Sequence, residues 1–146
     1  MGLALDLARG AGQVGDVPVG AVIVDESGEL VGHGANARER LDDPTAHAEV
    51  LALREAARHT GSWRLLGCTL VVTLEPCAMC AGAVVLARVP TLVVGAADPK
   101  AGACGSVWDL VRDSRANHRV DLVTGVREDE CGQLLRDFFR QRRSRT

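Results

Sequence analysis

The segment TLVVTLEPCAMC, residues 69–80, decides which fold this chain is expected to adopt. Residues 69–74 are apolar on both faces, which is typical of a strand in the centre of a sheet. Pro76 favours the start of a helix, so we predict a helix over residues 77–87, made largely of small and apolar side chains. A central strand that leads directly into a helix indicates a layered α/β domain.

Further elements are predicted on both sides of this segment. A helix is expected from the capping signal at residues 42–45 to about His59, and Gly61 ends it. Residues 19–24 and 30–34 are expected to form a hairpin around a turn at residues 25–28. The last predicted elements are strands at residues 91–95 and 119–123 and a helix at residues 128–143. This order predicts a single α/β domain over residues 1–146 with a mixed sheet.

The composition is that of an ordinary globular domain. Of the 146 residues, 47% are apolar and 25% are charged, and no apolar run approaches the ~20 residues that span a bilayer. The N-terminal residues have no basic region followed by an apolar core, so no signal peptide is expected. Five cysteines cannot all pair, and two of them form a Cys-x-x-Cys motif, which favours a metal site in a reducing compartment. We therefore expect a cytoplasmic protein without a membrane segment.

Four residues suggest a catalytic zinc site. His47, Cys77 and Cys80 supply imidazole and thiolate ligands, and three protein ligands leave a fourth zinc position open for water. We expect each ligand to lie in the first turn of a helix, where the helix dipole favours thiolates and other anions. Glu49 lies two residues after His47, so on a helix its side chain turns away from the ligand direction. It is therefore free to carry protons for the zinc-activated water, which predicts hydrolytic deamination.

A structural zinc site is the alternative interpretation. Such sites are closed by four protein ligands, and the fourth would come from Cys68, Cys104 or His59. The catalytic interpretation is favoured, because a structural site would leave Glu49 without a role.

The motifs also resemble those of a known family. The spacing His-x-Glu followed by Pro-Cys-x-x-Cys is typical of zinc-dependent nucleobase deaminases. Beyond it, the chain resembles the bacterial tRNA-specific adenosine deaminases of the cytidine deaminase-like superfamily from Leu3 to about Arg143. The blocks that carry this resemblance are DVPVGAV (16–22), DPTAHAE (43–49), TLEPCAMCAGA (73–83), the loop at 95–106, NHRV (117–120) and DFFR (137–140).

The resemblance implies a fold, an activity and an assembly. The fold is a three-layer α/β/α arrangement with a five-stranded mixed sheet. The chain begins where the family's first helix is usually under way, so either that helix is shortened or the start of the chain is misassigned. The reaction converts adenosine to inosine at the wobble position of a tRNA anticodon, with one Zn²⁺ per chain. The partners are the tRNA anticodon stem-loop and a second copy of the chain in a homodimer.

The resemblance also implies substrate-binding residues. Asn36 matches a base-contacting asparagine, and an amide presents both a donor and an acceptor to a purine edge. Val17 matches an apolar wall of the base pocket. The remaining implied RNA contacts are Asp98, Lys100, Phe139 and Arg142. Asn36 could equally be a turn residue, and Val17 a core residue.

Two other functions remain open. A deaminase of a free base or nucleoside, with guanine the most plausible substrate, would carry the same zinc motif but needs no basic C-terminal helix. A non-catalytic, zinc-stabilised RNA-binding module would not require Glu49. Five arginines lie in the last eleven residues, which either neutralise RNA phosphates or form a solvated helix end: Arg136, Arg140, Arg142, Arg143 and Arg145.

Overall fold

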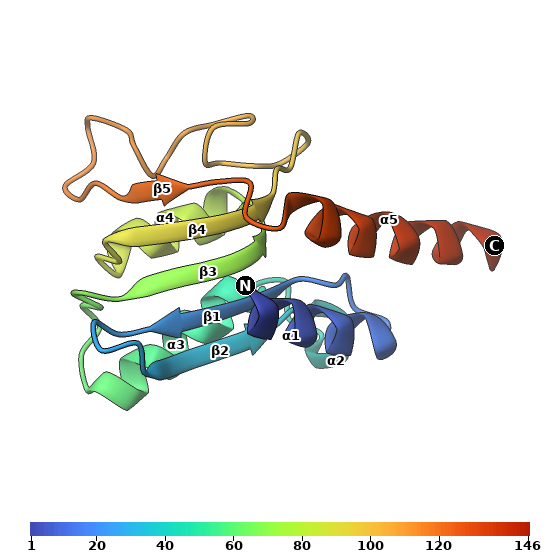
Figure 1. The fold of residues 1–146 in the computed structure, drawn as a ribbon, viewed down its shortest axis with the longest axis horizontal. Helices are drawn as coiled ribbons and strands as arrows, with labels where there is room; N and C mark the ends of the chain where they lie inside the picture. The colour runs from blue at the N-terminus through green and yellow to red at the C-terminus, as the bar shows by residue number, and fades with distance from the viewer.

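The sheet has five strands and is mixed. In a computed structural model that describes residues 1–146, the strand order is β2-β1-β3-β4-β5, drawn in Figure 1. Strand β1 pairs antiparallel with β2 and β3, whereas β3, β4 and β5 run parallel. The strands are β1 (Gly20–Val24), β2 (Leu30–Ala35), β3 (Thr69–Leu74), β4 (Thr91–Ala96) and β5 (Asp121–Val123).

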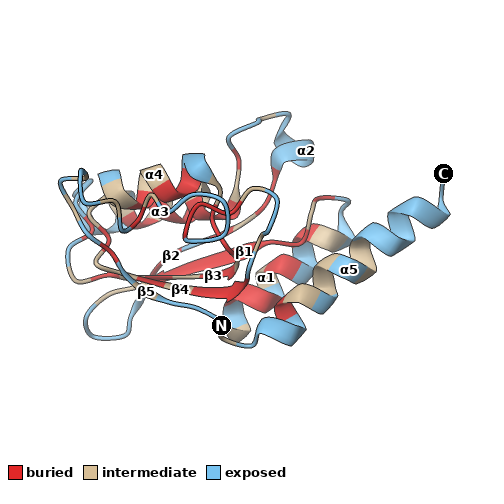
Figure 2. Cartoon of the chain, turned by 90° about the horizontal axis from the view of Figure 1, so that it is seen from above, coloured by how far each residue is buried: buried red, intermediate tan, exposed pale blue.

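Helices cover both faces of the sheet. Helices α3 and α4 lie on one face, and α1 and α5 lie on the other, as Figure 2 shows. The second half of α5 extends past the edge of the sheet into solvent (Figure 1). The helices are α1 (Gly2–Gln13), α2 (Arg38–Leu41), α3 (Ala48–Thr60), α4 (Ala78–Leu86) and α5 (Glu128–Ser144). This arrangement confirms the expected three-layer α/β/α fold.

Strand β3 lies at the centre of the sheet, as its apolar sequence predicts. Leu70 and Val72 are fully buried, and β3 has hydrogen-bonded neighbours on both sides. Its C-terminal end leads through Glu75 and Pro76 into α4. The parallel strand β4 ends at the same edge of the sheet, and so does β2, which is antiparallel to β1. Consequently, the segments that follow β2, β3 and β4 all meet at one edge.

The observed first residues of helices α3 and α4 differ from the predicted ones. Helix α3 begins at Ala48 rather than at residues 42–45, because the Asp43 carboxylate accepts hydrogen bonds from the Thr45 N–H (2.8 Å) and hydroxyl (2.7 Å) and closes a turn there. Helix α4 begins at Ala78, so His47 and Cys77 are N-cap residues rather than first-turn residues. Gly61 ends α3 in a left-handed conformation (φ 72°), as predicted.

Local sequence patterns did not predict the short helix α2. The fully buried Asp16 carboxylate accepts hydrogen bonds from the N–H groups of Glu39 (2.8 Å) and Arg40 (3.3 Å), which stabilises the start of this helix. That contact joins residues far apart in the sequence, and local patterns cannot reveal it. No helix is both long and apolar enough to cross a membrane.

Glycines let α3 approach the sheet closely. A Cβ at Gly34 on β2 would overlap the Ala48 carbonyl oxygen and lie 2.9 Å from Leu51 Cβ, and Gly32 meets the next turn of α3 in the same way. The first turn of α3 is therefore held directly against the strand.

We predict that Gly34→Ala lowers the free energy of unfolding by about 1–3 kcal/mol, because the added methyl group must push α3 away from β2. Chemical denaturation measures this. Gly10→Ala is the matched control: nothing lies within 4 Å of a Cβ there, and in a helix this change stabilises by roughly 0.5–1 kcal/mol. Equal stability of the two variants would contradict the close packing of α3.

Candidate metal centre and adjoining cavities

Three potential metal ligands converge where α3 and α4 begin. His47 immediately precedes α3, Cys77 immediately precedes α4, and Cys80 lies in the first turn of α4. The His47 Nδ1 atom lies 3.6 Å from Cys77 Sγ and 3.5 Å from Cys80 Sγ. The three ligand atoms all lie within 4.8 Å of one another. The structure thus brings together all three predicted ligands.

This donor set suits zinc and leaves room for a fourth ligand. One imidazole and two thiolates match the ligand preference of zinc. No other His, Cys, Asp or Glu joins the cluster. Of the side chains that could have closed it, Cys104 and Cys68 are buried elsewhere, and His59 is exposed near Glu29. A closed, purely structural site therefore finds no support.

Hydrogen bonds within the cluster favour a thiolate at Cys77. Hydrogen bonds from Cys80 and His47 lower the pKa of Cys77 to about 3. The hydrogen bond to Cys77, followed by burial, raises the pKa of Cys80, and the hydrogen bond to Cys77 raises that of His47. The hydrogen bonds of the cluster thus favour the thiolate form of Cys77 and the protonated forms of Cys80 and His47. A metal ion would replace those protons, as expected for ligands that bind in their deprotonated forms.

Glu49 lies beside the cluster without belonging to it. It is the second residue of α3, is only 4% exposed, and has a pKa raised mainly by burial. It lines an inner cavity of about 180 Å³ together with the ligands His47 and Cys77. A buried carboxyl group with a raised pKa, next to a metal site and an open cavity, is suited to general acid–base catalysis.

The inner cavity also includes the predicted base-contacting residues Val17 and Asn36. The Asn36 side-chain N–H donates to the Val17 carbonyl oxygen (3.1 Å), and its amide oxygen accepts from the Arg38 N–H (3.4 Å). An amide has two N–H donors and two acceptor lone pairs, so one of each remains for a ligand. The two local bonds fix the orientation of the amide.

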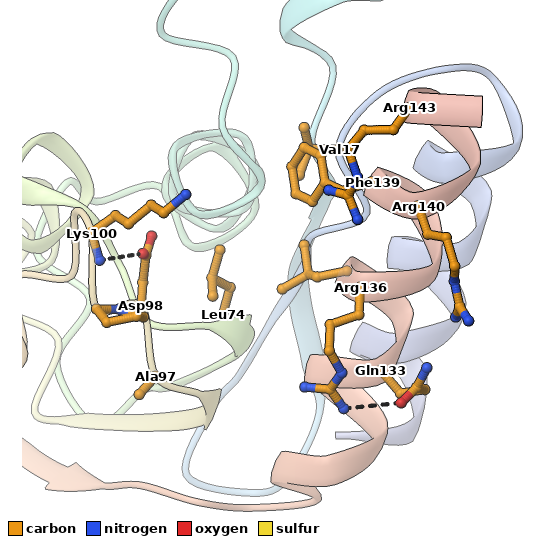
Figure 3. Close-up of a pocket in the computed structure, with 12 residues that line it drawn as sticks. Val17, Leu74, Ala97, Asp98, Lys100, Gln133, Arg136, Phe139, Arg140 and Arg143 are labelled. Atoms are coloured by element: carbon orange, nitrogen blue, oxygen red, sulfur yellow. Dashed lines mark hydrogen bonds between the residues drawn. The ribbon is translucent and has the colours of Figure 1, made fainter. Parts of the chain in front are cut away.

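A larger outer cavity, of about 870 Å³, adjoins the inner one. Val17, Leu74 and Asp98 line both cavities. In Figure 3 the outer cavity lies between the loop that carries Asp98 and Lys100 and the face of α5 that carries Phe139. The other side chains that α5 contributes are Gln133, Leu135, Arg136, Arg140 and Arg143.

Arg142 does not line this outer cavity. Its guanidinium lies 5.7 Å from the centre of the Phe138 ring, on a different face of α5, where it lines a separate hollow beside the end of α1. The sequence pointed to Arg136, Arg140 and Arg143 only as members of the basic tail and did not single them out as cavity residues. Helical spacing could have found them, because positions 136, 139, 140 and 143 repeat every three to four residues and share one face with Phe139.

Comparison with known proteins identifies the family to which this chain belongs. Residues 1–96 match the family described as the cytidine and deoxycytidylate deaminase zinc-binding region. The tRNA-specific adenosine deaminase of Bacillus subtilis is 49% identical over 142 residues, which cover 97% of this chain and 88% of that protein. The chain belongs to this family of zinc-binding deaminases. The resemblance inferred from the sequence motifs is thereby confirmed.

Solved structures of deaminases share the fold. One, from a study of A-to-I editing by tRNA:A34 deaminases at the wobble position of transfer RNA, superimposes with a TM-score of 0.88 at 42% identity and covers 92% of this chain and 97% of that chain. A guanine deaminase from Nitrosomonas europaea superimposes with a TM-score of 0.78 at 29% identity, covering 94% and 81%. This deaminase is thus more similar to the tRNA:A34 enzyme than to the guanine enzyme.

We predict that Cys77→Ala weakens zinc binding by this deaminase about 100-fold or more, because two protein ligands cannot replace the lost thiolate. Competition with a chromogenic chelator measures the affinity. Cys68→Ala is the matched control, since Cys68 is buried in the core away from the cluster. Equal loss of zinc in both variants would show that the cluster is not the metal site.

Proposed function

We propose that this chain hydrolyses adenosine to inosine at the wobble position of a tRNA anticodon and binds one zinc ion, with residues 1–146 acting as a single domain. The observation that carries the proposal is a His47–Cys77–Cys80 cluster beside the buried Glu49, in an inner cavity that opens into a larger one lined by cationic side chains. The similarity to tRNA-specific adenosine deaminases over nearly the whole chain supports the same substrate.

Glu49 is the proton carrier in this proposal. A zinc ion held by His47, Cys77 and Cys80 supplies the Lewis acidity that makes a water nucleophilic near neutral pH. Glu49 accepts one proton from water as the water oxygen attacks C6 of the adenine ring, and passes it to the ring nitrogen. Glu49 then takes the remaining proton from the new C6 hydroxyl group and donates it to the amine, so that the C6–N bond breaks and a C6 carbonyl forms. Water and adenosine are consumed, and inosine and ammonia are released. Burial keeps the Glu49 carboxyl group away from bulk water and raises its pKa, so it can act both as base and as acid.

The inner cavity orients the base. Val17 provides an apolar wall, and the fixed Asn36 amide offers one donor and one acceptor to the purine edge. Enzymes that modify a base must take it out of its stack, so the reacting adenosine enters this inner cavity alone.

The outer cavity accommodates the neighbouring nucleotides. Phe139 is 41% exposed and can stack on a base, while Lys100, Arg136 and Arg143 can contact phosphates. Asp98 uses one carboxylate oxygen to accept hydrogen bonds from the N–H groups of Lys100 (3.0 Å) and Ala101 (3.2 Å), which gives the loop a defined turn. A deaminase of free guanine would have no use for this cationic second cavity.

The protein is proposed to act in the cytoplasm as a homodimer. The homodimer is supported by exposed apolar side chains around α4. The Leu65 N–H donates to the Ala87 carbonyl oxygen at the end of α4, and the Ala103 N–H donates to Pro76 before its start, so both neighbouring loops flank this helix. The exposed apolar residues of α4 and of the two loops are Trp63, Leu66, Met79, Leu86, Val107 and Trp108.

One experiment separates the candidate functions. The zinc-loaded protein is incubated in parallel with a tRNA anticodon stem-loop containing adenosine 34, with guanine, and with cytidine, and ammonia release is measured. We expect release only with the stem-loop. Release from guanine alone would replace this proposal with a free-base deaminase, and no release with RNA binding intact would favour a non-catalytic RNA-binding module.

We predict that Glu49→Gln reduces kcat on the stem-loop by about 10²–10⁴-fold while zinc content stays unchanged, because the amide cannot carry protons. Single-turnover kinetics with parallel metal analysis measures both quantities. Glu55→Gln, on the exposed side of α3, is the control and should behave as wild type. Retained turnover in Glu49→Gln would remove this residue from the mechanism.

The two faces of α5 should contribute differently to RNA binding. We predict that Arg143→Ala weakens binding of the stem-loop and reduces the slope of log K against log salt by about 0.7, the value for one lost phosphate contact on a single strand. Arg142→Ala, directed to Phe138, should leave this slope nearly unchanged. Fluorescence anisotropy over a salt series measures the slopes, and the reverse ranking would place the RNA on the other face of the helix.

A further inference from the structure

Glu75 is a buried carboxylate that takes no part in the proposed chemistry. It lies between the end of β3 and Pro76, two residues before the ligand Cys77, and only 5% of it is exposed. Its backbone N–H donates to the Ala96 carbonyl oxygen (2.8 Å), which extends the pairing of β3 with β4. No lysine, arginine or histidine pairs with it, so an ion pair does not explain its burial.

The partners of Glu75 all come from one loop. Its Oε1 atom accepts hydrogen bonds from the Asp98 N–H (3.1 Å) and from the Ser106 hydroxyl. Its Oε2 atom accepts from the N–H groups of Cys104 (3.0 Å) and Ser106 (3.1 Å). These four bonds join both ends of the segment 98–106 to a single side chain. The backbone N–H groups of Asp98, Cys104 and Ser106 thus have in Glu75 a hydrogen-bond acceptor that the loop itself does not provide.

The loop also fits closely around this carboxylate. A Cβ at Gly102 would overlap the Glu75 carboxylate and lie 2.6 Å from the Asp98 carbonyl oxygen, so the loop needs glycine there. The Ala103 N–H donates to the Pro76 carbonyl oxygen (2.8 Å), one residue before Cys77. The loop is therefore fastened to the short segment that leads into the metal-binding helix.

The same loop forms one wall of the cavities. Asp98 lines both of them, Ala101 lines the inner one, and Pro99 and Lys100 line the outer one (Figure 3). The loop contributes no metal ligand and no proton carrier. Its position therefore affects how RNA is held more than how the bond to the amine is broken.

We propose that Glu75 is a positioning residue that fixes the 98–106 loop relative to the metal-binding helix and so sets the RNA-binding wall of the cavity. This inference rests on the proposed function, because it concerns the binding of the RNA substrate. Changes at Glu75 are therefore expected to alter KM for a structured RNA rather than the rate of the chemical step.

Glu75→Gln tests this with little change of volume. Its amide nitrogen can only donate, so it faces N–H groups that need an acceptor. Leaving one or more of these groups unpaired should raise KM for the zinc-loaded enzyme on the anticodon stem-loop about tenfold or more, with kcat altered less than about threefold. Zinc content should stay at the wild-type level. Amide hydrogen exchange at Asp98, Cys104 and Ser106 should accelerate, while exchange in α3 and β3 stays unchanged.

Ser106→Ala is the milder variant and remains informative if Glu75→Gln does not fold. It removes the hydroxyl bond and keeps the three backbone bonds, so KM should rise only about threefold. Glu55→Gln serves as the carboxylate control, with wild-type KM and wild-type exchange expected.

Three results would overturn the inference. One is an unchanged KM together with unchanged loop exchange in Glu75→Gln. Another is loss of zinc and kcat with KM unaltered, since Glu75 would then support the metal helix instead of the loop. The third is equal effects of Glu75→Gln and Glu55→Gln. Failure of the proposed function is distinguishable, because wild-type enzyme would then release no ammonia from the stem-loop, while exchange would still report whether Glu75 holds the loop.

Discussion

The meeting of two helix starts at one point is the constraint on which the rest of the structure depends. His47 reaches Cys77 and Cys80 at 3.6 and 3.5 Å only because α3 and α4 begin side by side at one edge of the sheet. The position of α3 is set by its close packing on Gly32 and Gly34 of β2, and that of α4 by the central strand β3. A metal ion bound there would thus be held by the core of the fold rather than by mobile loops.

The charges around this point change from the inside outward. The inner cavity holds acidic groups: a Cys77 thiol whose pKa is lowered, and Glu49, whose pKa burial raises. Besides apolar residues, the outer cavity is lined by four cationic side chains, three arginines from α5 and Lys100. The cationic side chains of the outer cavity therefore attract a polyanionic substrate. The inner cavity can admit a neutral base without charge repulsion. Cationic side chains are thus concentrated around one cavity although the net charge of the chain is −2.

The sequence predicted elements well where a local pattern determines them, and less well where distant contacts do. The apolar run at 69–74 and the terminal helix appear nearly where expected, and the His47, Cys77 and Cys80 side chains converge as their spacing predicted. Helix α2 and the late start of α3 were not predicted, because Asp16 and a turn at Asp43 determine them. Placing an arginine on the correct face of α5 requires knowing where α5 packs, which is why the sequence could not distinguish Arg143, which lines the outer cavity, from Arg142, which does not.

The topology of the sheet explains why chemistry and substrate choice can be separated in this fold. Parallel strands end at the same edge, and ligand sites in α/β sheets gather there. The segment after β3 carries metal ligands, whereas the segment after β4 carries only the cavity wall, so the second can change without disturbing the first. The segments that follow β3 and β4 must nevertheless keep a fixed position relative to each other, because both line the same cavities. The buried Glu75 carboxylate at the end of β3 accepts hydrogen bonds from both ends of the loop after β4 and meets that requirement, and it lines the inner cavity at the same time.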